Sequence, residues 1–147
     1  MTISSYGLSL ILAIVACVIG GVLGGLTLAR PGAVLGFTTL DDDADAPPAT
    51  GLATEGRALG GLLILSHAAT ALFLGYQSSV GAAMAFALAM AWLGAALGRA
   101  VSVLIDKERG RLNLTSLAFE ILIAVTLCLP FFNAGRLVVL RGHGMLV

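Results

Sequence analysis

The sequence predicts an all-α integral membrane protein, a bundle of four transmembrane helices. Of the 147 residues, 59% are apolar and only 11% are charged, whereas a soluble domain carries about a quarter charged residues. Four apolar runs are each long enough to cross a hydrocarbon core, which needs about 20 helical residues. We expect the helices at about 6–29, 58–76, 80–105 and 114–132, within a single transmembrane domain over 1–147.

The first run, 6–29, is expected to be a retained membrane helix rather than a signal peptide. It lacks a basic leading region, and its apolar stretch exceeds the roughly 7–15 residues usual in a signal peptide. The second and third runs are joined by the short "QSS", which predicts antiparallel neighbouring helices. The fourth run should begin near Asn113, a suitable N-cap, and end close to Pro130.

The remaining segments are read as connections. Residues 30–54 form a long loop with an acidic cluster and a Pro-Pro step. The cluster "DDDAD" lacks the Gly and Glu of a calcium loop and is interpreted as solvated. The tail, 133–147, contains Gly and Arg at several positions, so we expect a short interfacial segment there instead of a fifth span.

The basic residues predict an orientation in the membrane. Loops 30–54 and 106–113 reach the same side, and most of the Lys and Arg residues are found there or at the helix ends that meet it. By the positive-inside bias that side is cytoplasmic and both termini are outside. The basic residues on this side are Arg30, Arg57, Arg99, Lys107, Arg109 and Arg111, against Arg136 and Arg141 on the other.

Small residues recur four apart on three of the predicted helices. Between membrane helices apolar area gives no net attraction, so close backbone approach must provide it. These faces either pack the helices of this chain together or dock another protein, for which the ridge of the first helix is the best candidate. The glycines concerned are Gly20, Gly21, Gly24, Gly25, Gly60, Gly61, Gly94 and Gly98.

Two charges lie inside predicted spans. Arg99 is followed by six uncharged residues before Asp106, which places it about 10 Å inside the end of the third helix. Glu120 lies at a matching depth, about 9 Å inside the start of the fourth helix. Each charge alone is costly in hydrocarbon. We therefore predict that Arg99 and Glu120 form an ion pair or share a polar cluster.

Arg57 enters the membrane from the same side, and Glu55 is expected at the start of the second helix, where the macrodipole favours an anion. The predicted intramembrane polar cluster is therefore Glu55, Arg57, Arg99 and Glu120. Two interpretations stay open. The cluster either holds the helices in register, or it binds a lipid headgroup or small anion or relays a proton.

His67 lies near mid-membrane among small neighbours, so a pigment or haem ligand is one interpretation and a hydrogen-bonded interior histidine is the other. No Cys or His spacing indicates a metal site, and Cys17 and Cys128 are interpreted as core thiols. No nucleophile elbow, HExxH or phosphate-binding loop is found, which argues against hydrolase or nucleotide chemistry, and we expect the protein not to be an enzyme. The zero net charge gives no indication of nucleic-acid binding.

Three short motifs carry a family resemblance: Glu-x-Arg followed by Gly-Gly in the second helix, Gly-Arg closing the third, and Glu within the fourth. With them the chain resembles a family of small bacterial four-helix inner-membrane proteins known only as a domain of unknown function. The resemblance implies a multi-pass protein of the bacterial inner membrane and brings no activity or cofactor with it. It covers roughly residues 55–131, on Glu55, Arg57, Gly60, Gly61, Gly98, Arg99 and Glu120.

These observations favour a non-catalytic accessory or scaffold subunit that binds other membrane subunits through its small-residue faces. One alternative is a small carrier or lipid- or anion-binding protein that uses the Arg/Glu cluster. A second alternative is a pigment- or haem-binding subunit that uses His67. The lipid bilayer is the expected surrounding in all three.

Overall fold

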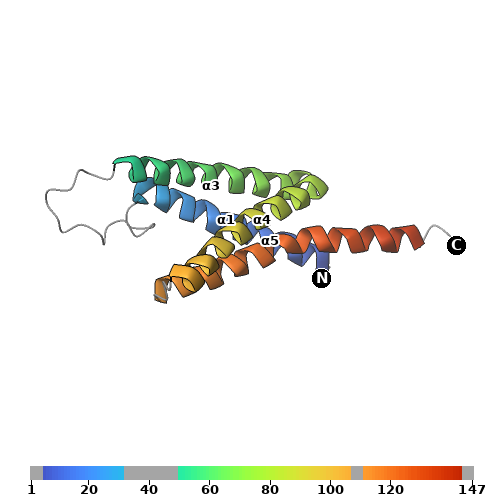
Figure 1. The fold of residues 1–147 in the computed structure, drawn as a ribbon. Helices are drawn as coiled ribbons and strands as arrows, with labels where there is room; N and C mark the ends of the chain where they lie inside the picture. The colour runs from blue at the N-terminus through green and yellow to red at the C-terminus, as the bar shows by residue number, and fades with distance from the viewer. Residues whose placement is uncertain (1–4, 32–49, 107–110, 144–147) are drawn as a thin grey trace, which may run out of the picture. The chain divides into compact units, whose positions relative to one another are not determined.

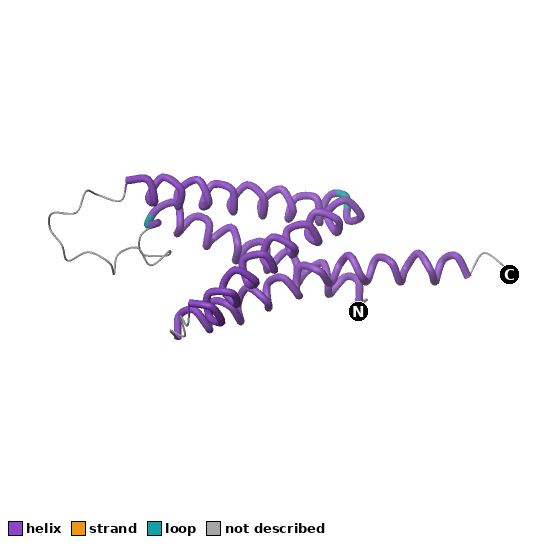
Figure 2. The backbone as a smooth tube through the Cα atoms, in the orientation of Figure 1, coloured by secondary structure: helices purple, strands orange, loops and turns teal. Residues whose placement is uncertain are grey.

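The computed structural model describes residues 5–31, 50–106 and 111–143, and these residues are almost entirely helical (Figure 2). Four helices of this part are long and apolar enough to cross a membrane, and the fold class is all-α, as predicted. The elements are α1 (Ser5–Ala29), α3 (Thr50–Tyr76), α4 (Ser78–Val101), η2 (Ser102–Asp106) and α5 (Arg111–His143).

The chain divides into two compact units, 17–69 and 1–16 with 70–147. In the unit 17–69, the end of α1 and the start of α3 lie side by side and run antiparallel (Figure 1). Gly24 and Gly60 face each other at this contact. A Cβ atom on Gly24 would lie 2.8 Å from the Gly60 carbonyl oxygen, and one on Gly60 would lie 2.7 Å from the Gly24 carbonyl oxygen. The two backbones therefore touch directly.

In the other unit, α4 and α5 pack as an antiparallel pair through aromatic contacts. The rings of Phe86 and Phe131 stack with centroids 4.5 Å apart, and Phe132 meets Phe86 edge-on at 6.2 Å. Further along, Trp92 meets Phe119 edge-on at 6.0 Å. On α4 the buried residues recur at helical spacing, so one stripe faces the neighbouring helices. They are Gly81, Ala82, Ala85, Leu88, Ala89 and Ala96.

The connection between α3 and α4 is tighter than the sequence predicts, because Gln77 alone separates the two helices. Its backbone N–H donates to the Phe73 carbonyl at 2.8 Å, and its own carbonyl accepts from Gly81 at 2.9 Å. A Cβ atom on Gly81 would lie 2.5 Å from the Leu74 Cα, so only glycine permits this close return of the chain.

Helix α3 begins at Thr50, earlier than the predicted 58. After Pro47 and Pro48 the sequence contains no further proline before the apolar run, and Ala, Leu and Glu all favour continued helix. The first turn of α3 holds no acidic residue, so the placement of Glu55 at the helix start is wrong. Most of the predicted loop 30–54, including "DDDAD", lies outside the described residues.

Helix α5 begins at Arg111, so Asn113 is not its N-cap, and it continues to His143. Pro130 therefore lies inside the helix and not near its end, and the separate tail predicted from 133 is helix as far as His143. The glycines in this last part of α5 each cost the helix about 1 kcal/mol. The helix continues through them because it is already nucleated, and each added residue gains a backbone hydrogen bond.

Hydroxyl groups within the spans bond back to their own helices. Thr27 Oγ1 donates to the Leu23 carbonyl at 2.8 Å, and Thr126 Oγ1 donates to the Leu122 carbonyl at 2.8 Å. Hydrocarbon offers no hydrogen-bond partner for a hydroxyl group. Ser and Thr are tolerated there because their hydroxyl groups hydrogen-bond to carbonyl groups of the same helix.

The adjacent glycines of α3 give the first prediction. Gly60→Ala places a Cβ atom 2.5 Å from the Leu28 backbone nitrogen, so we expect destabilisation of about 1–3 kcal/mol from overpacking. Gly61→Ala meets nothing within 4 Å and should be neutral, or stabilising by up to about 1 kcal/mol. Thermal unfolding in detergent compares the two variants. Equal melting temperatures would show that the α1–α3 contact is not this close.

Candidate functional site

The candidate site is an ion pair between α4 and α5. Arg99 lies in the last turn of α4 and Glu120 on α5, and the Arg99 Nε donates to Glu120 Oε1 at 2.6 Å. The pairing predicted from their matched depths is present. Because opposite charges in hydrocarbon offset one another, the pair removes much of the several kcal/mol that either charge costs alone.

The pair is open rather than bidentate. Glu120 Oε2 is buried and has no hydrogen-bond partner among the described residues, although the Glu120 side chain is only 6% exposed. The Arg99 side chain is 41% exposed, and the described residues give its terminal Nη groups no acceptor. A buried polar atom without a partner costs about 1–3 kcal/mol, and more when it is charged. Glu120 Oε2 can therefore accept a further hydrogen bond, and the Nη groups of Arg99 can donate further hydrogen bonds.

The end of α4 and the adjoining η2 carry exposed apolar side chains. Leu97 is 67% exposed, Val101 52% and Leu104 75%, although residues two or five positions from Arg99 do not share its face of the helix. Immediately after α4 the chain widens into the π-helical η2, a departure from α-helix that occurs frequently at functional sites. Gly98 has nothing within 4 Å of its Cβ position. The helix surface next to Arg99 in sequence is therefore formed by backbone, with no side chain above it.

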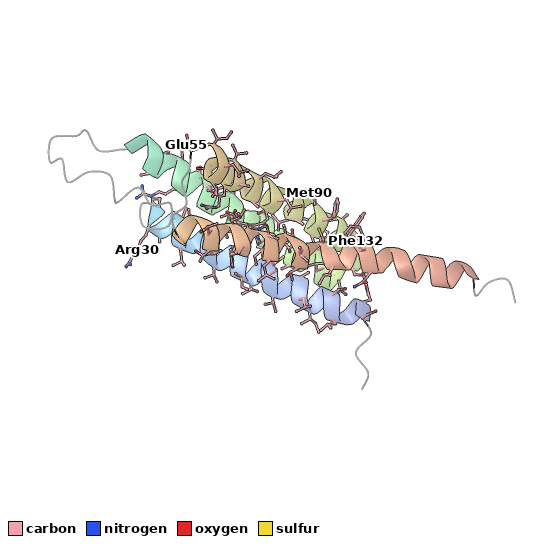
Figure 3. All side chains as sticks on the ribbon, turned by 60° about the horizontal axis from the view of Figure 1, so that its bottom comes forward. Arg30, Glu55, Met90 and Phe132 are labelled. Carbon is pink, nitrogen blue, oxygen red and sulfur yellow. The ribbon has the colours of Figure 1, made fainter. Side chains whose placement is uncertain are left out.

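Glu55 and Arg57 lie on α3, in the unit 17–69, and both side chains are exposed. Figure 3 shows Glu55 near the start of α3, at the same end of the α1–α3 pair as Arg30. Their membership of a shared cluster with Arg99 and Glu120 stays a prediction, since the two pairs belong to different compact units.

His67 is fully buried in the α1–α3 contact. Its Nδ1 lies 2.7 Å from the Leu63 carbonyl oxygen, and because a carbonyl only accepts, Nδ1 carries the donated proton. The ring lies against Gly20, where a Cβ atom would come 2.7 Å from the His67 Cε1. Part of the space beside the ring that the sequence assigns to a flat ligand is therefore occupied by α1. These contacts favour the interior, hydrogen-bonded interpretation.

The predicted glycine faces divide into two groups. Gly20, Gly24 and Gly60 touch the neighbouring helix of their own unit, so that a side chain on any of them would overlap it. The others have nothing within 4 Å of the Cβ position and turn toward the outside: Gly21, Gly25, Gly61, Gly94 and Gly98. Among the described residues, no group of three or more His, Cys, Asp or Glu side chains could hold a metal ion.

Several features of the site carry no signal in the sequence. Depth counting finds which charges pair, but it does not show that the pair is open, since that depends on the rotamers of Arg99 and Glu120. The requirement for glycine at Gly20 is also hidden, because GxxxG spacing does not show which glycine meets His67. For η2, we find no residue pattern in Ser102–Asp106 that indicates π-helix.

In the part of the chain that the structure describes, four apolar helices and an ion pair whose carboxylate is buried define a multi-pass α-helical membrane protein. Residues 7–130 match the model of a family described as a domain of unknown function, DUF4345, and the chain belongs to that family. The resemblance to a family of unknown function is thereby confirmed, and the match also includes the first helix and the first loop. Neither a curated protein nor a solved structure matches the chain.

The ion pair gives the second prediction. Arg99→Met leaves the carboxylate of Glu120 buried without its cation, so we expect a loss of about 3–5 kcal/mol in stability. The double variant Arg99→Met with Glu120→Leu removes both charges and should recover most of that loss. A double-mutant cycle of thermal unfolding in detergent measures the coupling. Additive effects would show that the two side chains do not interact.

His67 gives the third prediction. Because its ring is packed on Gly20 and its Nδ1 is bonded within α3, we expect the purified protein to show no absorption band above the protein ultraviolet. The absorption spectrum of protein prepared from native membranes in mild detergent measures this. A visible band that disappears in His67→Leu would establish the cofactor interpretation instead.

Proposed function

We propose that this protein is a non-catalytic accessory or scaffold subunit of a larger membrane protein complex. It docks through an open glycine patch on the α1–α3 pair, formed by Gly21, Gly25 and Gly61. The support for this docking surface is that the glycines occur in adjacent pairs. One member of each pair closes the contact within the chain, and the next residue turns outward with nothing within 4 Å.

The three open glycines lie on one side of the α1–α3 pair. Gly24 and Gly60 face each other, and the two helices run antiparallel. Two antiparallel helices that touch in this way are related by a two-fold axis. The axis passes through the Gly24–Gly60 contact, perpendicular to the plane that contains both helix axes. The residue that follows each contact residue therefore turns to the same side, so Gly25 and Gly61 share a face. Gly21 is one turn from Gly25 and joins them.

This surface suits a partner helix. A side without Cβ atoms allows another backbone to approach closely, and close approach is what drives helix association in lipid. Exposed apolar side chains lie three or four residues from the glycines and border the patch, at Val18, Leu28 and Leu65. A partner helix laid over the glycines would pack against these side chains as well.

The same proposal places the protein in the bacterial cytoplasmic membrane with loops 30–54 and 106–113 in the cytoplasm. Its support is the excess of basic residues on the side that these loops reach.

The docking surface gives the fourth prediction. Gly25→Leu with Gly61→Leu fills the patch without touching the α1–α3 contact, so the chain should fold but lose its partner. Gly75→Leu is the matched control, since Gly75 is also open but lies outside the patch. Native electrophoresis after extraction in mild detergent measures the size of the complex. A wild-type chain that migrates as a lone monomer would contradict the proposal.

A further inference from the structure

The ion pair of Arg99 and Glu120 has hydrogen-bonding capacity that the described chain does not use. A pair whose only task is to hold two helices together gains by closing on both oxygens, because bidentate contacts satisfy more donors and acceptors. Here the contact joins Nε to Oε1, while Oε2 is buried without a partner among the described residues and the Arg99 side chain is 41% exposed. The open geometry is what a bound group with both an acceptor and a donor would complete.

We propose that Arg99 and Glu120 form a binding site for a phospholipid headgroup. The outer Nη edge of Arg99 binds the phosphate, and Glu120 Oε2 accepts a hydrogen bond from an ammonium or hydroxyl group of the same headgroup. This site is separate from the glycine patch and goes beyond the proposed docking function, so either can fail without the other.

The chemistry of each side chain fits this assignment. The planar guanidinium presents its N–H groups as a fork that matches two phosphate oxygens. Glu120 already holds Nε at 2.6 Å, so the carboxylate fixes the direction of the fork and acts as a positioning group for the phosphate contact. With Oε1 engaged by Nε, the second oxygen of the same carboxylate, Oε2, is the acceptor left for a headgroup donor.

The location also fits a lipid. Arg99 lies in the last turn of α4, and η2 then continues to the polar Asp106, so the guanidinium is within reach of the membrane interface. Leu97, Val101 and Leu104 are exposed on the same stretch of helix, and they offer apolar surface to the acyl chains of lipids at this level of the bundle. The open Gly98 lets a headgroup approach the α4 backbone closely.

The two contacts predict a selectivity among lipids. Phosphatidylethanolamine provides N–H donors and phosphatidylglycerol provides O–H donors, whereas the quaternary ammonium of phosphatidylcholine provides none. All three present a phosphate to Arg99. The loss of one charge-assisted hydrogen bond corresponds to about a tenfold change in affinity, so phosphatidylcholine should bind about tenfold more weakly than the other two.

The experiment uses the full-length chain in detergent and native mass spectrometry with the three lipids, matched in their acyl chains. We expect ethanolamine and glycerol lipids to bind about tenfold more tightly than the choline lipid. Inorganic phosphate at millimolar concentration is the arm for a free anion, and we expect it to displace no lipid. Equal binding of the three lipids, or displacement by inorganic phosphate, would overturn the proposal.

Three variants assign the effect to the site. Arg99→Gln with Glu120→Gln avoids a lone buried charge, and it should lose tight binding of all three lipids. Glu120→Gln alone should keep the phosphate contact but abolish the preference for ethanolamine over choline lipid. Arg30→Gln, an exposed arginine just after α1, is the control and should bind as the wild type does. Wild-type lipid binding by the double variant, with an unchanged melting temperature, would refute the site.

Discussion

The hydrocarbon core of the membrane offers the chain no hydrogen-bond partner. It also provides no hydrophobic effect that would bring one helix to another. The structure follows from these two constraints. Backbone groups are satisfied within long helices, and hydroxyl groups such as that of Thr27 bond to the same helix. Attraction between helices must then come from close contact. Gly24 and Gly60 provide it in one unit, and Gly81 allows the close return of the chain at Gln77 in the other.

The same solvent makes charge expensive, which gives the Arg99–Glu120 pair its significance. A carboxylate in the apolar interior requires a cation, and α4 supplies one at 2.6 Å. The pair leaves Glu120 Oε2 buried without a hydrogen-bond partner among the described residues. The proposed headgroup site would give this oxygen and the exposed Arg99 guanidinium a common partner, which a simple link between α4 and α5 would not.

The depth of individual residues proved easier to predict than the ends of helices. Counting residues from the polar ends of α4 and α5 places Arg99 and Glu120 at one level because the rise per residue in a helix is constant. Helix ends depend on small free-energy differences, and the sequence around Thr50 and beyond Pro130 contains both helix-favouring and helix-breaking residues. The structure resolves these conflicts in favour of helix, which lengthens α3 and α5.

The sequence by itself determined the solvent, the fold class and the partners of the buried charge, because apolar length and charge depth are properties of each helix alone. It also marked the glycines as contact residues. Only the tertiary structure decided which glycine of each adjacent pair touches its neighbour, since that depends on how each helix is rotated about its axis. The rotation of each helix is set by its packing at Gly20, His67 and the residues around them. That packing depends on side chains that are distant from one another in the sequence.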